Sequence, residues 1–271
     1  MKKGKHYKKK NYKVKKLRIK LKPRFFLNII LIISIICNIS FINIISKLKK
    51  EHKEDLNNKV KVSNEIKVEK NNYDNKENEV VSKVKKLKEE NNDIIGWIKI
   101  NGTNIDYPVV QGEDNDYYVT HDYKKQLTKK GAIFLDKDYD WTIPSSNILL
   151  YGHNNKGDNE MFSELLKYKD EKFYKENPTV KFATTEEEAE YEIIAVFLSR
   201  VYYKNEENVF RYYYFVNAKN EEEYNDFVNN AKKASLYDTG KTAEYGEQLI
   251  TLSTCEYSQE DGRFAIVARK K

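Results

Sequence analysis

The chain has 271 residues, of which 49 are basic and 42 acidic, so its formal net charge is +7. Hydrophobic residues make up 39% of it, with 21 Tyr and 12 Phe against 4 Pro, and this composition excludes a wholly disordered chain. The net charge is +13 over residues 1–24, zero over 25–46, +3 over 47–90 and −9 over 91–271. Because the large C-terminal part is acidic, the sequence predicts no nucleic-acid partner.

Residues 25–46 form an uncharged stretch of 22 residues dominated by Ile, Leu and Phe. At about 1.5 Å per residue, a helix of that length crosses a hydrocarbon core of about 30 Å. A cleaved signal peptide is the alternative, but its apolar region is shorter and ends at small residues, whereas Lys47 to Lys50 follow here. We expect a retained single-pass transmembrane helix, with the basic tail 1–24 in the cytoplasm and the rest outside the cell.

Residues 47–90 are rich in Lys, Glu and Asn and contain no Gly or Pro. Val80, Val81, Val84 and Leu87 recur at helical spacing near the end of this segment. The pattern predicts a charged spacer, helical or disordered, whose last part is an amphipathic helix that leads into a domain at residues 91–271.

From Ile94 the pattern changes to short runs of β-branched and aromatic residues separated by turns. The predicted strands are Gly96–Ile100, Ile105–Val110, Gly131–Leu135, Asn147–Tyr151, Thr179–Ala183, Glu190–Val201, Gln248–Cys255 and Arg263–Ala268. Helical patterns are confined to about Met161–Lys175 and to Glu221–Ala234. Many closely spaced strands with few helices favour a mostly antiparallel barrel or sandwich with helical insertions.

The chain has two cysteines, Cys37 inside the apolar stretch and Cys255 near the C-terminus. The predicted exported domain therefore holds one thiol and cannot form an internal disulfide. Exported domains commonly pair their thiols, so an unpaired one indicates either a reactive nucleophile or a small buried hydrophobic residue. Composition alone leaves both interpretations open.

The residues around Cys255 in the sequence favour the interpretation that it is a reactive nucleophile. It ends a predicted strand, and after a polar loop Arg263 opens the next, so a hairpin would make the two residues neighbours. A guanidinium there can stabilise a thiolate and an oxyanion, although a surface charge at a strand end is the simpler alternative. His153 follows an apolar strand and a glycine, which suits a proton carrier facing a cleft, and we prefer it to His121.

These residues resemble a known family. The string Thr251-Leu252-Ser253-Thr254-Cys255, with Arg263 eight residues later and His153 about a hundred residues earlier, is similar to the signature of the sortases, membrane-anchored cysteine transpeptidases of Gram-positive bacteria. The resemblance covers roughly residues 90–271. Its further segments are Gly96–Ile98, Asp106–Val109, Asn115–Tyr118 and Gly131–Asp136. The helical lead-in and the helical insertion before the Cys strand resemble class B of the family.

The resemblance implies a closed eight-stranded β-barrel with an N-terminal helix and a helical insertion. It implies a cysteine peptidase of the hydrolase class in which His153, Cys255 and Arg263 are catalytic and no metal or organic cofactor is needed. The substrate-binding residues would be Asn115, Val119, Ser253 and Glu256. The implied partners are surface proteins with a C-terminal sorting signal, an amine acceptor from a peptidoglycan precursor or a pilin, and membrane lipid around residues 25–46.

Two other functions fit the residues. An exported cysteine protease would use the same groups but pass the acyl group to water, and a non-catalytic surface-binding module would keep Cys255 in its core. An amine adduct separates the first from a transpeptidase, and native-state thiol labelling separates the second.

Overall fold

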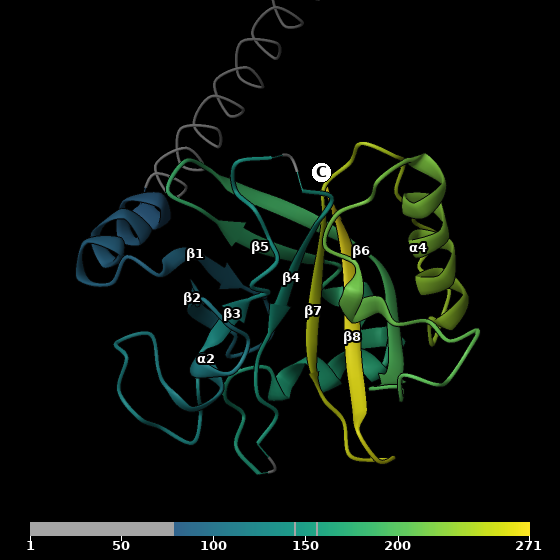
Figure 1. Cartoon of the computed structure of the whole chain (residues 1–271), viewed down its shortest axis with the longest axis horizontal. Coiled ribbons are helices and arrows are strands. Elements are labelled where there is room, and N and C mark those ends of the chain that lie inside the picture. Colours follow the sequence, from purple (N-terminus) through teal and green to yellow (C-terminus); the bar gives the residue numbers. More distant parts are fainter. Residues whose placement is uncertain (1–78, 144, 156) are drawn as a thin grey trace, which may run out of the picture. The chain divides into compact units, whose positions relative to one another are not determined.

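The computed structural model describes residues 79–143, 145–155 and 157–271. Within them, eight strands close into a barrel in the order β1-β2-β3-β4-β7-β8-β6-β5 (Figure 1). The strands are β1 Ile94–Lys99, β2 Asp106–Gln111, β3 Ile133–Leu135, β4 Asn147–Tyr151, β5 Thr179–Ala183, β6 Glu188–Arg200, β7 Leu249–Cys255 and β8 Gly262–Lys270. The predicted closed eight-stranded barrel is confirmed; the predicted bounds of β4 and β5 match, and the other strand ends differ by at most two residues.

Most neighbouring strands run antiparallel, as predicted. The β1–β2 connection turns at Gly102, whose φ of 73° lies in the left-handed region that glycine adopts without steric cost. The pairs β2–β3 and β4–β7 are parallel. The second of these parallel pairs matters for function, because it brings the ends of two strands that are far apart in sequence to the same rim of the barrel.

Strands β6 and β8 are apolar on both faces because each separates two cores. On β8, Phe264 and Ile266 point into the barrel, whereas Ala265 and Val267 contribute to a second core outside it. On β6 the register shifts between Ile193 and Ala195, so that two successive residues, 194 and 195, both join the outer core. The run of apolar residues in each strand therefore reflects burial on both sides.

Helix α4, Glu221–Ala234, covers the outer core and matches the predicted bounds. It buries Tyr224, Phe227, Val228 and Ala231, whose spacing places them on one face. Asn220 caps its N-terminus by accepting a hydrogen bond from the backbone N–H of Glu223. Acidic residues in the first turn and lysines in the last turn interact favourably with the helix dipole.

The other predicted helical segment, about Met161–Lys175, is broken in two. A 3₁₀ helix, η1 Ser163–Lys169, is followed by α3, Glu171–Glu176. Asp170 between them has an extended backbone and its side chain accepts from Lys172 N, so it is the N-cap of a new helix. Two short elements were not predicted: α2 Tyr117–Thr120 and the 3₁₀ helix η2 Tyr212–Tyr214.

The predicted amphipathic helix before the barrel is present and helical over 79–90. Val84 is fully buried in a small core with β1 and β2 residues, and Val80 and Leu87 pack against that core. No helix in the described part of the chain has both the length and the apolar character needed to cross a membrane. The predicted membrane segment 25–46 lies outside the described residues.

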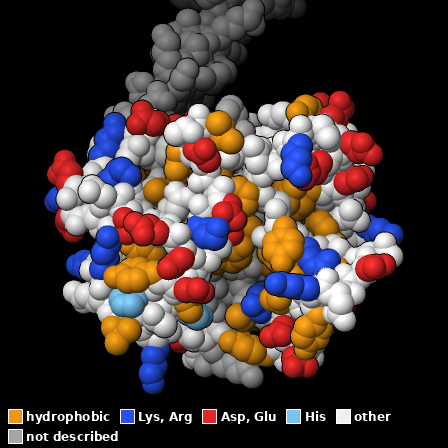
Figure 2. Space-filling view, in the orientation of Figure 1, with side chains coloured by type: hydrophobic (Ala, Val, Ile, Leu, Met, Phe, Trp, Pro, Cys, Tyr) orange, Lys and Arg blue, Asp and Glu red, His pale blue; other side chains and the backbone are white. Residues whose placement is uncertain are grey.

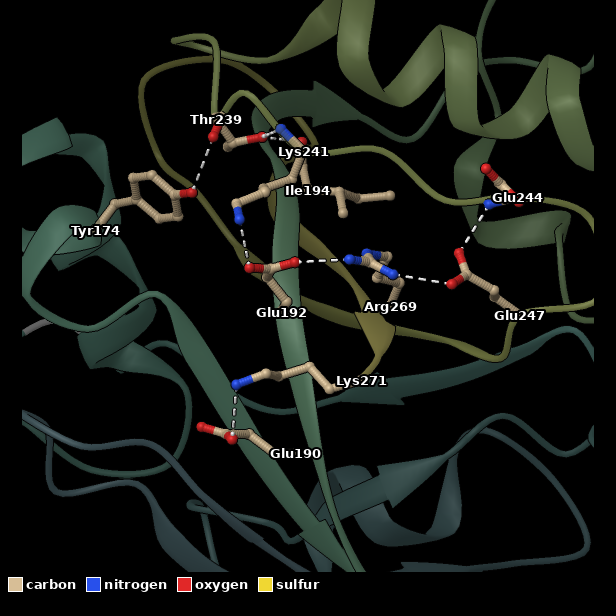
Figure 3. A network of polar contacts seen from close by, with 10 residues as sticks. All are labelled: Tyr174, Glu190, Glu192, Ile194, Thr239, Lys241, Glu244, Glu247, Arg269 and Lys271. Atoms are coloured by element: carbon tan, nitrogen blue, oxygen red, sulfur yellow. Dashed lines mark hydrogen bonds and ion pairs between the residues drawn. The ribbon is translucent and has the colours of Figure 1, made fainter. Parts of the chain in front are cut away.

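A network of ion pairs ties the connection between α4 and β7 to the barrel (Figure 3). Glu192 of β6 accepts from Lys241 of this connection at 2.8 Å and from Arg269 of β8 at 2.9 Å. Arg269 also reaches Glu247 at 2.8 Å. The Glu192 side chain is 15% exposed, so these contacts are only partly screened by water.

We expect Glu192→Gln to lower the free energy of unfolding by about 1 kcal/mol at neutral pH. The hydrogen bond from Lys241 outweighs the cost of burial and, with that from Arg269, holds the pKa of Glu192 below its ordinary value of 4.5. Its stabilising contribution is therefore complete above pH 4.5 and is lost as the pH falls below that value. Denaturant unfolding at neutral pH and at a pH below 4.5 measures this contribution, with the exposed Glu207→Gln as control. An equal effect of both variants would contradict the prediction.

Candidate active site

The candidate histidine and cysteine lie at the ends of two neighbouring parallel strands, His153 two residues beyond β4 and Cys255 as the last residue of β7. Pairing of β4 with β7 ends at Tyr151 and Ser253, and every pair in this ladder has the same offset of 102 residues. The residues two positions further along each chain are His153 and Cys255, which share that offset. Since adjacent strands lie about 4.8 Å apart, the register brings His153 and Cys255 to one rim of the barrel.

Hydrogen bonds continue the register beyond the last strand pair. Thr254 Oγ1 donates to the carbonyl oxygen of Gly152 at 2.7 Å, and Asn154 Nδ2 donates to that of Cys255 at 2.8 Å. Gly152 has no room for a side chain, because a Cβ there would lie 2.4 Å from Ile133 Cδ1. The chain therefore leaves β4 along a fixed path, with His153 beside the end of β7.

Arg263 lies opposite Cys255, as the sequence predicts. The two are a pair in the antiparallel register of β7 and β8. The loop between them closes tightly: Asp261 has a φ of 51°, and a Cβ on Gly262 would meet the carbonyl oxygen of Glu256 at 2.2 Å. Arg263 Nη1 donates to the carbonyl oxygens of Asp261 and Gly262 at 3.2 and 3.0 Å. This leaves Nε and Nη2 without a partner among the described residues.

The ring of His153 is oriented by a backbone carbonyl. His153 Nε2 lies 2.8 Å from the carbonyl oxygen of Val119, at the end of α2. A carbonyl oxygen can only accept, so Nε2 carries the hydrogen and Nδ1 is the nitrogen left to exchange a proton. Gly131, at a φ of 60°, packs so closely that a Cβ would lie 2.7 Å from the Val119 oxygen and 3.1 Å from His153 Cδ2.

These groups face one cavity of about 590 Å³. It lies over β4, β7 and β8, between α2 and the segment that contains η2, on the face where Figure 2 shows hydrophobic side chains gathered in the middle. Its lining is Asn115, Asp116, Val119, Phe134, Tyr151, Gly152, His153, Val201, Tyr212, Tyr213, Ser253, Thr254, Cys255 and Arg263. The cavity thus brings together all three predicted catalytic residues and three of the four predicted substrate-binding residues.

Tyrosines supply much of the wall, and no pattern in the sequence assigns them to the site. The hydroxyl of Tyr212 lies 2.7 Å from Ser253 Oγ, so Ser253, which is 2% exposed, already has one partner. Burial raises the pKa of Tyr212 and of Tyr151, so both phenols are neutral at physiological pH. The only signal for Tyr212 is the run of three tyrosines at 212–214, far from the other site residues in sequence.

No group of three or more His, Cys, Asp or Glu side chains in the described part of the chain is arranged to hold a metal ion. The cavity instead offers a thiol, an imidazole, a guanidinium and several amide and hydroxyl groups. These suit nucleophilic acyl transfer at a peptide bond.

Glu256, the fourth predicted substrate-binding residue, is not among the residues that line the cavity. Its side chain is 7% exposed and accepts from Lys169 Nζ at 2.7 Å and from Ser258 N at 2.9 Å. Burial raises the pKa of this carboxyl, but the hydrogen bonds from Lys169 and Ser258 outweigh it and hold the pKa at about 2. In this structure Glu256 fastens the loop between Cys255 and Arg263 to η1.

We expect Glu256→Gln to lower the free energy of unfolding by about 2 to 3 kcal/mol. Because the folded pKa is about 2 against an ordinary 4.5, the contribution is complete above pH 4.5 and is lost as the pH falls toward 2. Denaturant unfolding over that pH range measures it. Glu260→Gln in the same loop removes an equal but exposed charge and should change little. If Glu256→Gln were as stable as wild type at neutral pH, the ion pair would have no structural role.

A β-barrel with a cysteine, a histidine and an arginine around one cavity at its rim defines a barrel-fold protein with a cysteine site of the kind that acyl transfer uses. The Sortase domain model matches residues 98–271 of this chain. Sortase B of Listeria monocytogenes is 34% identical over 191 residues, which cover 69% of this chain and 74% of that protein. The chain belongs to the sortase family, and its relatives place it in class B.

Solved structures of class B sortases match the fold of this chain. The Staphylococcus aureus sortase B–substrate complex matches with a TM-score of 0.62 and 28% identity, covering 71% of this chain and 86% of that one. Clostridium perfringens sortase B matches with a TM-score of 0.62 and 32% identity, covering 69% and 98%. A sortase B complexed with triglycine matches with a TM-score of 0.62 and 29% identity, covering 71% and 86%.

Proposed function

We propose that this protein is a membrane-anchored transpeptidase that cleaves a C-terminal sorting signal of surface proteins after a threonine and joins the protein to an amine. The acceptor amine belongs to a peptidoglycan precursor or to another protein. The observation that carries the proposal is that His153, just beyond β4, Cys255, at the end of β7, and Arg263 of β8 line one cavity. The substrate complex of S. aureus sortase B and the triglycine complex of a sortase B support a peptide donor and an amine acceptor.

In the first step the Cys255 thiolate attacks the carbonyl carbon of the threonine. Arg263, through donors not used by its own loop, stabilises the charge on the carbonyl oxygen of the tetrahedral intermediate. The C–N bond then breaks, and His153 gives a proton to the departing amine through Nδ1. The products are a thioester on Cys255 and a released C-terminal peptide.

In the second step the acceptor amine attacks the thioester carbonyl and gives a proton to His153. The C–S bond breaks, an amide bond forms, and Cys255 returns as the thiolate. One amide is exchanged for another, so the reaction consumes neither water nor a redox partner. Hydrolysis follows the same course with water in place of the amine, and exclusion of water from the thioester therefore decides between a transpeptidase and a protease.

The predicted helix at residues 25–46 supports a location at the outer face of the cell membrane. The +13 charge of residues 1–24 favours a cytoplasmic N-terminus. An anchored enzyme shares a surface with its anchored substrate and with a lipid-linked acceptor, which raises the effective concentration of both. Protease accessibility of the domain in intact cells tests this orientation.

A product assay tests the activity. The full chain is incubated with a library of internally quenched peptides that share one fixed threonine, with and without triglycine. We expect cleavage after the threonine and, with triglycine, a product whose mass contains it. Cleavage without any triglycine adduct would make the protein a protease, and no cleavage together with an unreactive Cys255 thiol would favour the binding module.

A further inference from the structure

A buried carboxylate lies behind the cavity wall. Asp136 follows β3 and is 4% exposed. Its Oδ2 accepts from the Tyr151 hydroxyl at 2.9 Å and from Asn115 Nδ2 at 3.0 Å, and its Oδ1 accepts from Asp138 N at 2.9 Å. Asp136 does not line the cavity, but Tyr151 and Asn115 both do. It thus binds two residues of the cavity wall from behind.

The two ends of the Asn115 side chain are held differently. Its Nδ2 donates to Asp136, and its Oδ1 accepts from the backbone N–H of Lys137 at 2.9 Å. A carboxylate only accepts and a backbone N–H only donates, so the amide cannot be flipped without losing both bonds. The amide nitrogen has two N–H groups and the amide oxygen two lone pairs, and each of these bonds uses one of them. One N–H and one lone pair of Asn115 therefore remain in fixed positions for a ligand.

We propose that Asp136 is a positioning residue that fixes the direction in which Asn115 presents its donor and its acceptor to the cavity. The ligand chemistry that matches is one residue of an extended peptide, whose own N–H and C=O point to the same side. A fixed order of donor and acceptor accepts that residue in one chain direction only. The inference rests on the proposed function, because it assigns the orientation of the peptide whose threonine meets Cys255.

The replacement Asp136→Asn tests the direction. An amide at position 136 cannot accept from Asn115 Nδ2 and Tyr151 while also accepting from Asp138 N, so one of these bonds must be lost or Asn115 must flip. With the peptide that the full wild-type chain cleaves best, we expect KM to rise about tenfold while kcat is unchanged. The rate at which a methanethiosulfonate reagent modifies Cys255 should also be unchanged, because none of the hydrogen bonds of Asp136 involves Cys255. Asp138→Asn, which removes an exposed charge two residues away, is the control.

The exchange Asp136→Asn with Asn115→Asp separates positioning from structure. The amide at 136 can then donate to the carboxylate at 115, which still accepts from Lys137 N, so thermal stability should return toward that of wild type. The carboxylate at 115 offers no N–H to a ligand, so the raised KM should persist. Recovery of KM together with stability would reduce Asp136 to a structural role and overturn the proposal.

The orientation of Asn115 can also be measured without a substrate. In the full chain labelled with ¹⁵N-asparagine, the side-chain N–H of Asn115 that meets Asp136 should exchange slowly with solvent, and Asp136→Asn should make it fast. If wild type cleaves no library peptide, the proposed function fails while this experiment still decides the orientation. Equal exchange in both proteins would overturn the positioning role.

Discussion

Replacement of Cys255 by alanine is expected to abolish peptide cleavage and amine transfer, with a fall of about a thousandfold or more. Cys255 carries the only thiol among the residues that line the cavity, and the neighbouring hydroxyls of Ser253 and Thr254 are already hydrogen-bonded within the protein. Removing the thiol should leave the fold intact, because Cys255 is half-buried and its carbonyl, which accepts from Asn154, is unchanged.

Cys37→Ala provides a matched control, because the chain has two cysteines. That variant should cleave as wild type does, and mass spectrometry of the trapped intermediate should find the acyl group on Cys255. Equal loss of activity in both variants, or an acyl group on any other residue, would contradict the assignment.

Replacement of Arg263 by lysine should lower kcat by about a hundredfold or more, although the charge is retained. The arginine bonds its own loop through Nη1 and keeps Nε and Nη2 for the cavity, and a single ammonium group cannot do both. Since the oxyanion exists only after attack, the loss should fall on kcat and leave substrate binding less affected.

Arg269→Lys is the control on the same strand. Arg269 lies at the other end of β8 and pairs with Glu192 and Glu247, so its replacement should lower stability and leave kcat unchanged. Single-turnover measurement of thioester formation gives the rate constant of the first step alone. A lysine at position 263 that acylates at the wild-type rate would show that charge, and not donor geometry, is what the reaction needs.

The sequence predicts most of the barrel because local patterns carry the information. Alternation and turn residues place all eight strands, and the hairpin that joins β7 to β8 makes Cys255 and Arg263 neighbours without any knowledge of the rest of the fold. The sequence pattern does not predict the break at Asp170, because the apolar residues on either side keep helical spacing. An aspartate in the middle of a helical pattern is itself a capping signal.

Contacts between distant segments could not be predicted in this way. The parallel pairing of β4 with β7 joins residues 102 apart, and no periodicity encodes it. The partner of Glu256 is Lys169, and the partner of Ser253 is Tyr212, each on a separate element. The family resemblance implies a substrate contact for Glu256, and the fold shows that its carboxylate accepts hydrogen bonds from Lys169 and Ser258.

The parallel register of β4 and β7 has a consequence for how this protein can be altered. His153 and Cys255 are fixed by two strand ends and by the bonds between them, so the length and sequence of much of the chain between these residues do not set their separation. The segment from Val201 to Ala234, which carries η2 and α4, supplies part of the cavity wall and contributes neither of the strands that hold these residues. Grafting that segment from a relative should therefore exchange the preferred peptide while the cysteine chemistry is retained, so that peptide choice and acyl transfer can be engineered separately on one barrel.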